Sequence, residues 1–416
     1  MKKIYTCIDM ASDTIRILVS EYFSGKFNTL AVTSVRSKGI KNGIIIDPDL
    51  LKERLQYALK DISSRINIPI KKAILTIPSI NAEFNLVHGN ISIINDEKMV
   101  TRKDVMRVQN AVVKDIAPNM ELIDISPIDF TIYENGSEIE TLKNPINKIC
   151  DRLAVRAMVV TVPKTNVIAY VKVAESCGIE VVDVVLDSIA DFEETKDEDM
   201  LDNNSAIINL GSDVTSVSIF NKGIITNSSV INNGTSVIDN DISYVYYISK
   251  KNARKAKETF GIAHPKYANK SETYETKDIN EKLVKINQHE LSLMINKRLV
   301  ELLNVSKNEL KVLTNKQIRY IMIIGGIIDI PGINFVVEDV LGSNTKVYTI
   351  NTLGIRKGRF ITVSGAIKYF VKKINIMKKE YSMFSSDDID NLVNNKVRIG
   401  RNNSVFGRVF SYFFDN

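Results

Sequence analysis

Apolar residues at the start of the chain gather in short runs separated by polar turns. Ile4–Asp9 and Ile15–Ser20 are predicted to be strands joined by the turn Met10–Thr14, and Leu30–Arg36 a third strand. Their length and β-branched content favour a sheet over a helix.

A helix is predicted next. Asp47 is placed to cap it and Pro48 to occupy its first turn, and the apolar residues of Leu50–Arg65 recur at helical spacing. Lys72–Pro78 then has the pattern of a buried strand. Strands, a helix and another strand indicate an α/β layer.

The opening pattern returns roughly 200 residues later. Ala206–Leu210 and Val214–Phe220 are predicted strands around the turn Gly211–Asp213. Two similar halves that face each other form a cleft, which is where ligands usually bind.

The rest of the chain predicts several more elements. Predicted strands are Phe130–Tyr133, Ala157–Val162, Glu180–Leu186 and Ile318–Ile324. Predicted helices are Arg102–Asp115, Thr165–Cys177, Asn252–Thr259, Ile279–Leu302, Lys307–Leu313 and Thr362–Lys373. The acidic segment 191–202 and the stretch Pro265–Glu275 are predicted to be solvated loops.

The composition narrows the class of protein. The chain has 416 residues with 44% hydrophobic and 25% charged, enough for two or more globular domains, and no apolar run reaches the roughly 20 residues that span a bilayer. The three cysteines and three histidines are scattered along the chain, which argues against a disulfide framework and against a zinc site. The net charge of +6 is consistent with a weak attraction to anionic lipid, and a genome with biased base composition would also produce it. The chain has no pattern of basic and aromatic residues that would indicate nucleic-acid binding.

The two polar turns have residues that suit an anion. The small and hydroxylated ones are Ala11, Ser12 and Thr14 in the first turn and Gly211, Ser212 and Thr215 in the second. Asp9 and Asn209 end the preceding strands, and a carboxylate at Asp9 suits a hydrated Mg²⁺. Either turn alone is usually a plain hairpin. The pair, with Gly325-Gly326 after a buried strand where backbone can approach a ribose, favours a nucleotide.

These turns and glycines resemble the phosphate 1, phosphate 2 and adenosine motifs of the actin, Hsp70 and sugar-kinase superfamily, and the whole chain is most similar to the FtsA family of bacterial cell-division proteins. Further matches are Gly39–Asp47, Lys143–Ile146 with Arg152-Leu153, Asn233–Thr235 with Asn240–Ile242, and the C-terminal tail. The resemblance implies an α/β actin-like (ribonuclease H-like) two-domain fold with an inserted subdomain of the FtsA 1C type and a C-terminal amphipathic helix.

Domain boundaries follow from this resemblance. The first domain comprises residues 1–80, a return segment 164–188 and a helix 360–378; the inserted subdomain is 81–163; the second domain is 189–359; a linker 379–403 leads to a membrane-targeting helix 404–414.

The resemblance also implies ATP with Mg²⁺ as the ligand, with Asp9 holding the metal through water. The implied nucleotide-binding residues are Asp9, Ala11, Ser12, Thr14, Arg16, Asn209, Gly211, Ser212, Asp213, Thr215, Gly234, Lys257, Gly325 and Gly326.

The chain departs from the family pattern around this cleft. Residues that differ are Ala11 for Gly, Asn209 for Asp, Ser212 for Gly, Val214 for Thr, Ser216 for Asp, Arg254 for Glu and Ile327 for Gly. Because losing one transition-state contact costs about 3–4 kcal/mol, we expect weak ATP binding and little or no hydrolysis.

The tail has one apolar helical face. Its members are Phe406, Val409, Phe410, Phe413 and Phe414, with Arg408 beside them for lipid headgroups. A docked core helix is the alternative; a position beyond a polar linker favours the membrane.

Together these features predict a membrane tether and scaffold of the division ring at the septum, on the cytoplasmic face of the membrane. By resemblance its partners are the FtsZ tail on residues 235–315, later division proteins on residues 81–163, copies of itself, and anionic lipids, with no nucleic acid. The alternatives are a pilus-assembly actin homologue or a sugar-kinase-like enzyme; we find no general-base Asp for the latter.

Overall fold

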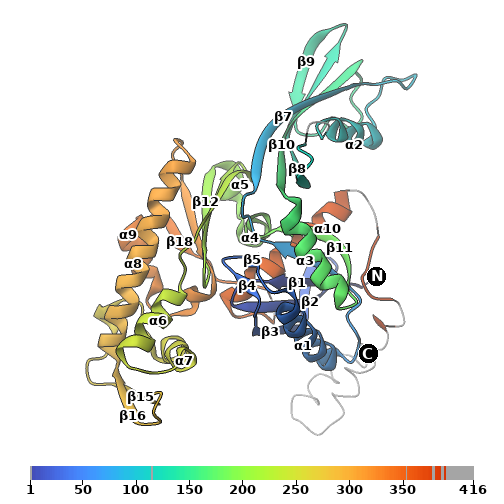
Figure 1. Cartoon of the computed structure of the whole chain (residues 1–416). Helices are drawn as coiled ribbons and strands as arrows, with labels where there is room; N and C mark the ends of the chain where they lie inside the picture. The colour runs from blue at the N-terminus through green and yellow to red at the C-terminus, as the bar shows by residue number, and fades with distance from the viewer. Residues whose placement is uncertain (1, 114–115, 353, 377–379, 386–387, 390–416) are drawn as a thin grey trace, which may run out of the picture.

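The computed structural model describes residues 2–113, 116–352, 354–376, 380–385 and 388–389. Within them lie two domains with a five-stranded sheet each, and a smaller inserted domain with a four-stranded sheet that projects away from both (Figure 1). The predicted linker residues 390–403 and the predicted amphipathic helix 404–414 lie outside the described residues.

The element bounds are as follows. The strands are β1 Lys3–Met10, β2 Thr14–Phe23, β3 Lys26–Arg36, β4 Ile40–Lys41, β5 Ile44–Ile45, β6 Lys72–Ile77, β7 Glu83–Ser92, β8 Met120–Glu134, β9 Ser137–Leu142, β10 Arg152–Pro163, β11 Glu180–Leu186, β12 Asn204–Leu210, β13 Thr215–Asn221, β14 Ile224–Ile231, β15 Thr273–Lys277, β16 Leu283–Asn287, β17 Tyr320–Ile324 and β18 Thr345–Val347. The α-helices are α1 Pro48–Ile66, α2 Arg102–Ala111, α3 Lys164–Ser176, α4 Asp187–Thr195, α5 Glu198–Asp202, α6 Ser236–Val245, α7 Lys250–Phe260, α8 Gln288–Leu313, α9 Ile333–Leu341 and α10 Ile361–Ile376, and the 3-10 turns are η1 Pro265–Tyr267, η2 Gly326–Asp329 and η3 Gly358–Phe360.

The sheet of the first domain has the order β11-β6-β1-β2-β3. β1 pairs parallel with β6 and antiparallel with β2. β1 and β2 form a hairpin, and residues 11–13 are the turn that joins them. The predicted cap of α1 is confirmed, since the Asp47 side chain accepts a hydrogen bond from the backbone N–H of Leu50 at 3.0 Å. The buried side chains Leu51, Leu55 and Ile62 fix α1 in the core of this domain.

The sheet of the second domain repeats this plan. Its order is β14-β13-β12-β17-β18, with β12 antiparallel to β13 and parallel to β17. A separate core built around Ile208, Leu299 and Ile323 holds the sheet to α8. The cleft between the domains therefore has one strand–turn–strand unit on each side.

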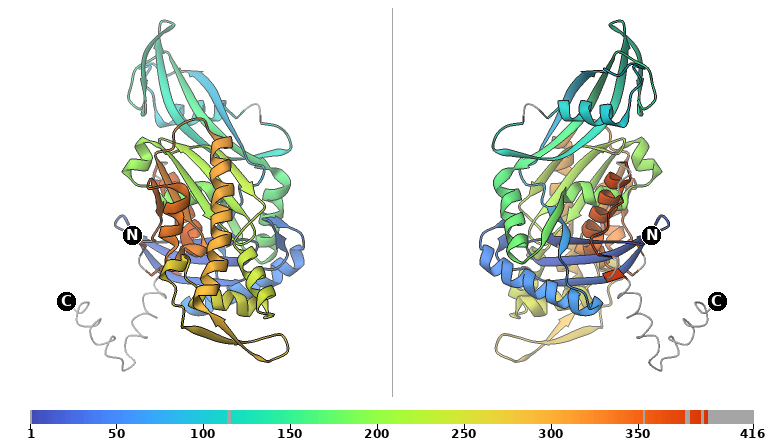
Figure 2. Two further views of the ribbon diagram at one scale, coloured as in Figure 1. Left: turned by 90° about the vertical axis from the view of Figure 1, so that its left-hand side faces the viewer. Right: turned by 90° about the vertical axis from the view of Figure 1, so that its right-hand side faces the viewer.

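The inserted domain has the sheet β7-β10-β8-β9 and its own small core, which includes Val108 of α2, Phe130 of β8 and Val155 of β10. Figures 1 and 2 show it at one end of the molecule and the β15–β16 hairpin at the other. β10 continues directly into α3 without a loop.

Four predictions about local structure differ from what the structure shows. Most of the acidic segment 191–202 is helical, in α4 and α5, and not a loop. Its first half is buried, with Glu194 paired to Lys368 of α10 at 2.9 Å, while residues 197–199 are exposed. The predicted boundary between residues 188 and 189 falls inside α4.

The segment 265–313 also differs from its prediction. It contains the short β15–β16 hairpin followed by one helix, α8, of 26 residues, in place of a loop and two helices. Polar, partly exposed hairpin strands lack the apolar alternation that marks a strand.

The predicted linker begins later than residue 379. Met383 and Phe384 are buried, and the backbone N–H of Met383 donates to the carbonyl of Ile4 at 3.0 Å. This short segment therefore packs along β1.

Candidate functional site

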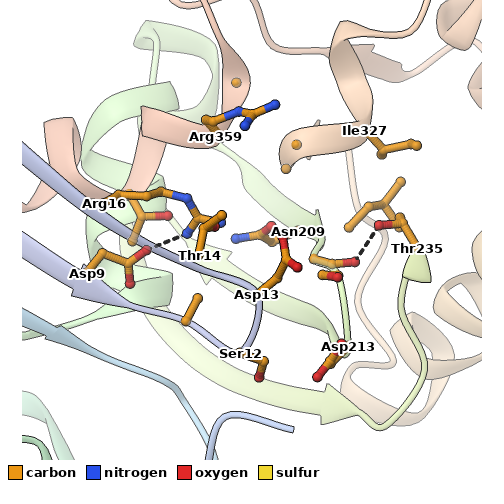
Figure 3. A pocket seen from close by; sticks show the side chains of 18 of the residues that line it. Asp9, Ser12, Asp13, Thr14, Arg16, Asn209, Asp213, Thr235, Ile327 and Arg359 are labelled. Atoms are coloured by element: carbon orange, nitrogen blue, oxygen red, sulfur yellow. Dashed lines mark hydrogen bonds and ion pairs between the residues drawn. The ribbon is translucent and has the colours of Figure 1, made fainter. Parts of the chain in front are cut away.

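A cleft of about 990 Å³ lies between the two domains (Figure 3). Most of the predicted nucleotide-binding residues line it: Asp9, Ala11, Ser12, Thr14, Arg16, Asn209, Gly211, Ser212, Asp213, Lys257, Gly325 and Gly326. Two do not. Thr215 is buried and donates to the carbonyl of Asn233 at 2.8 Å, and Gly234 packs under the second turn.

The first turn is held by its neighbours. The backbone N–H of Ala11 donates to the carbonyl of Thr14 at 3.1 Å, which closes the turn. Ser12 Oγ accepts from the N–H of Gly43 at 2.9 Å, and the Gly43 carbonyl accepts from the buried hydroxyl of Tyr170 at 2.9 Å. The Gly39–Asp47 motif thus braces the turn from below.

Asp9 already has partners for both carboxylate oxygens. One accepts from Arg16 at 2.5 Å and the other from the hydroxyl of Thr76 at 2.7 Å. Among the described residues no group of three or more His, Cys, Asp or Glu side chains is arranged to hold a metal. A hydrated Mg²⁺ at Asp9 would have to share this carboxylate with Arg16.

The second turn is tied to the start of α6. The N–H groups of Thr235 and Ser236 donate to the carbonyls of Gly211 and Ser212, both at 2.8 Å. A Cβ on Gly234 would lie 2.3 Å from the Ser212 carbonyl oxygen, so only glycine permits this approach.

Behind the second turn, Asn209 joins the two domains. Its amide donates to Asp191 of α4 at 2.8 Å, and the hydroxyl of Thr362 donates to the other oxygen of Asp191 at 2.6 Å. Burial, helped by the nearby charge of Asp187, raises the pKa of Asp191 to about 8. Burial also raises the pKa of Asp187 to about 6.

The glycine pair lies after β17 at the edge of the cleft. Gly325 has a φ of 115°, and a Cβ there would lie 2.4 Å from the carbonyl oxygen of Leu210, whereas a Cβ on Gly326 would meet nothing within 4 Å. Ile327 reaches the cleft but is only 3% exposed, because its side chain packs in the core of the second domain.

Sequence reasoning found Asp9 and Asp213 but missed other charged residues of the cleft. Asp13 of the first turn, Asp187 and Asp239 line it, as do the cations Arg356, Lys357 and Arg359. Asp13 lies inside the motif and could have been chosen from its position; the others required knowledge of which distant segments meet.

Comparisons with known proteins decide between the superfamily members. The model of "Cell division protein FtsA" matches residues 206–365 and that of "SHS2 domain inserted in FTSA" matches residues 81–161. FtsA of Enterococcus hirae is 27% identical over 368 residues, covering 88% of this chain and 82% of its own, and FtsA of Bacillus subtilis is 26% identical over 382 residues, covering 91% and 86%. The chain belongs to the FtsA family.

Solved structures support the same fold. A PilM–PilN type IV pilus biogenesis complex superposes with a TM-score of 0.56 at 11% identity, covering 88% of this chain and 98% of its own. MreB5 of Spiroplasma citri bound to ADP gives 0.52 at 14% identity, covering 91% and 99%. The fold is therefore actin-like, with the SHS2 domain of FtsA inserted, and the predicted fold class and FtsA resemblance are confirmed.

Two departures from the FtsA pattern, Asn209 and Arg254, form polar side-chain contacts inside the chain. Arg254 of α7 binds Asp13 and Asp239, and Lys257 binds Asp239 at 2.6 Å.

In the part of the chain that the structure describes, no helix is long and apolar enough to cross a membrane.

Proposed function

We propose that this FtsA-family protein is a membrane tether and scaffold of the bacterial division ring. It links FtsZ filaments to the cytoplasmic face of the membrane at the septum and assembles with copies of itself. The observation that carries the proposal is the paired match to FtsA, which covers both the inserted SHS2 domain and the second domain. The inserted domain is then the place for later division proteins.

An exposed apolar patch on the second domain supports FtsZ docking. It combines the end of α6 with the start of the β15–β16 turn, where the N–H of Ile279 donates to the carbonyl of Tyr247 at 3.0 Å. Its exposed members are Tyr244, Val245, Tyr247, Ile279 and Leu283. Contiguous exposed apolar side chains on a soluble surface favour a protein partner.

The docking test uses the FtsZ C-terminal peptide and two tyrosine variants. Tyr244 is 87% exposed, so Tyr244→Ser removes apolar area without opening the core. We expect at least tenfold weaker peptide binding by fluorescence anisotropy. Tyr57→Ser, on the exposed face of α1, is the matched control and should bind as wild type. Equal binding by both variants would contradict docking at the patch.

The membrane test compares two equal charges on opposite sides of the predicted tail helix. Phe410→Glu puts a carboxylate on the apolar face, at a cost of several kcal/mol in the acyl boundary, whereas Ser411→Glu puts it on the polar face. In co-flotation with anionic liposomes and FtsZ polymer, the first variant should release both proteins and the second should float like wild type. Floating of a truncation before Ser404 would overturn the proposed tether.

We propose weak binding of ATP with Mg²⁺ in the cleft and slow hydrolysis or none. The turn backbones at Ser12 and Ser212 and the open side of Gly326 suit phosphates and a nucleoside. The partners of Asp9 and the amide at Asn209 leave few free charges for the metal. Steady-state release of many phosphates per minute would contradict this part of the proposal.

A further inference from the structure

One salt-bridge network spans the mouth of the cleft. Arg254 Nη1 lies 2.7 Å and 2.8 Å from the two carboxylate oxygens of Asp13, and its Nε lies 3.0 Å from Asp239. Lys257 completes the network on the other oxygen of Asp239 at 2.6 Å. Two carboxylates thus meet two cations, and the network is neutral.

The network joins parts of the chain that belong to different domains. Asp13 lies in the turn of the first domain, 241 residues from Arg254, while Asp239, Arg254 and Lys257 lie on α6 and α7 of the second domain. Figure 3 shows Asp13 projecting from its turn into the space between the two turns. Arg359, just before α10, approaches Glu258 of α7 at 3.7 Å and adds a weaker link of the same kind.

The environment makes this link strong for an ion pair. The side chains of Arg254 and Asp13 are each 21% exposed and that of Asp239 is 4% exposed, so water screens them little. Burial opposes the charge of Arg254, but the attraction of Asp13 and Asp239 outweighs it and raises the pKa of the guanidinium. A guanidinium shared between two carboxylates is also held in a fixed orientation.

We propose that the Asp13–Arg254–Asp239 network is a built-in strap that holds the two domains together across the cleft through side chains of the protein alone. The Asp13 carboxylate stands at the turn that a phosphate would approach, and it already holds the nearest guanidinium. A phosphate that approaches this turn would therefore compete with Asp13 for Arg254. The conformation of the protein is set by this strap and not by nucleotide. This goes beyond the proposed function and does not depend on nucleotide binding.

The experiment measures the distance between the domains in the full-length chain. Exposed Lys60 of α1 and Lys311 of α8 are replaced by Cys for spin labels, with Cys177→Ser in the background and the buried Cys7 and Cys150 retained. Wild type should give one narrow distance distribution that Mg-ATP does not change. Arg254→Gln and, separately, Asp13→Asn should broaden the distribution toward longer distances, and Arg254→Lys should restore it in part.

The control is Arg156→Gln in the inserted domain, which breaks a bidentate pair with Asp129 that stays within one sheet. It should leave the distribution unchanged. A narrow, unshifted distribution in both Arg254→Gln and Asp13→Asn would overturn the strap, as would a wild-type distribution that is broad until Mg-ATP is added.

A titration with Mg-ATP separates the strap from the proposed nucleotide site. Asp13→Asn frees Arg254 and removes a repelling carboxylate, so affinity should rise at least about fivefold. If no variant binds ATP while the distances shift as stated, nucleotide binding fails and the strap stands. If ATP binds to wild type and Asp13→Asn equally, Asp13 does not compete with phosphate and that part of the strap is wrong.

Discussion

The two sheets share strand order and pairing directions, yet the turns that end their first hairpins differ in charge. The first turn has two carboxylates, Asp9 at its strand end and Asp13, whereas the second has Asn209 at its strand end and one carboxylate, Asp213. Arg254 and Lys257 of the second domain lie in the same cleft, and Arg254 binds Asp13. A common hydrophobic plan gives the same topology twice, because the core does not depend on the polar residues at strand ends. Those residues remain free to make the halves complementary to each other.

The largest expected effect is on the pH dependence of stability, and it comes from Asp191, which lies behind the strand end at Asn209. Burial keeps Asp191 protonated below a pKa of about 8, against about 4 in the unfolded chain, so it stabilises the folded state at low pH and that contribution is lost as pH rises from about 4 to about 8. Asp191→Asn should remove up to about 5 kcal/mol of this dependence. Melting temperatures of both proteins between pH 5 and pH 8 measure the change in slope.

An exposed carboxyl provides the comparison. Asp199→Asn on α5 should leave the pH dependence of the melting temperature as in wild type. Parallel curves for wild type and Asp191→Asn would contradict the assignment of a protonated Asp191.

The next effect concerns the ends of the equivalent strands β6 and β17. β6 is followed by Pro78 and β17 by Gly325, whose positive φ and contact with Leu210 exclude a side chain. Gly325→Ala should destabilise the protein by about 3 kcal/mol, from backbone strain and overlap together. Gly326→Ala, with open space at its Cβ, should change chemical denaturation midpoints little, and equal losses would show that φ and packing at Gly325 are not decisive.

Asn209→Asp makes the two strand ends alike. It replaces an amide donor to Asp191 with a second carboxyl group, and we expect a loss of about 2 kcal/mol at pH 8 without metal. Mg²⁺ should recover stability, and Mg²⁺-dependent ATP binding should strengthen in calorimetry. A variant whose stability and ATP affinity ignore Mg²⁺ would place the metal elsewhere.

The smallest effect separates the two serines of the turns. Ser12 Oγ accepts from Gly43, while Ser212 contributes its backbone carbonyl to Ser236. Ser12→Ala should cost about 1 kcal/mol and Ser212→Ala only a few tenths, measured by urea unfolding. The reverse order would mean that the Gly43 hairpin does not brace the first turn.

The sequence predicted elements whose pattern is local. The two strand–turn–strand units and the cap at Asp47 follow from neighbouring residues, and the structure has them. Burial of Glu194 could not be predicted, because its partner Lys368 lies on α10, and acidic runs are ordinarily solvated.

The candidate site follows the same rule. Its turns and glycines were identified from short motifs, and most line the cleft. The link from Arg254 to Asp13 escaped prediction because 241 residues separate them and only the meeting of the domains brings them together. From the sequence alone, Arg254 was interpreted only as the replacement of a glutamate that would bind the ribose of a nucleotide.

Met383 packs along β1, so the segment that leads to the predicted membrane-binding tail begins at a fixed place on the first domain. The last described residue is Ile389, and 15 residue steps of at most about 3.6 Å separate it from Ser404, so the chain between them spans no more than about 54 Å. If the tail binds lipid as proposed, this length is the ceiling on the gap between Ile389 and the membrane. If FtsZ docks on the second domain as proposed, its distance from the membrane is limited by this linker length and by the size of the first domain, on which the linker begins.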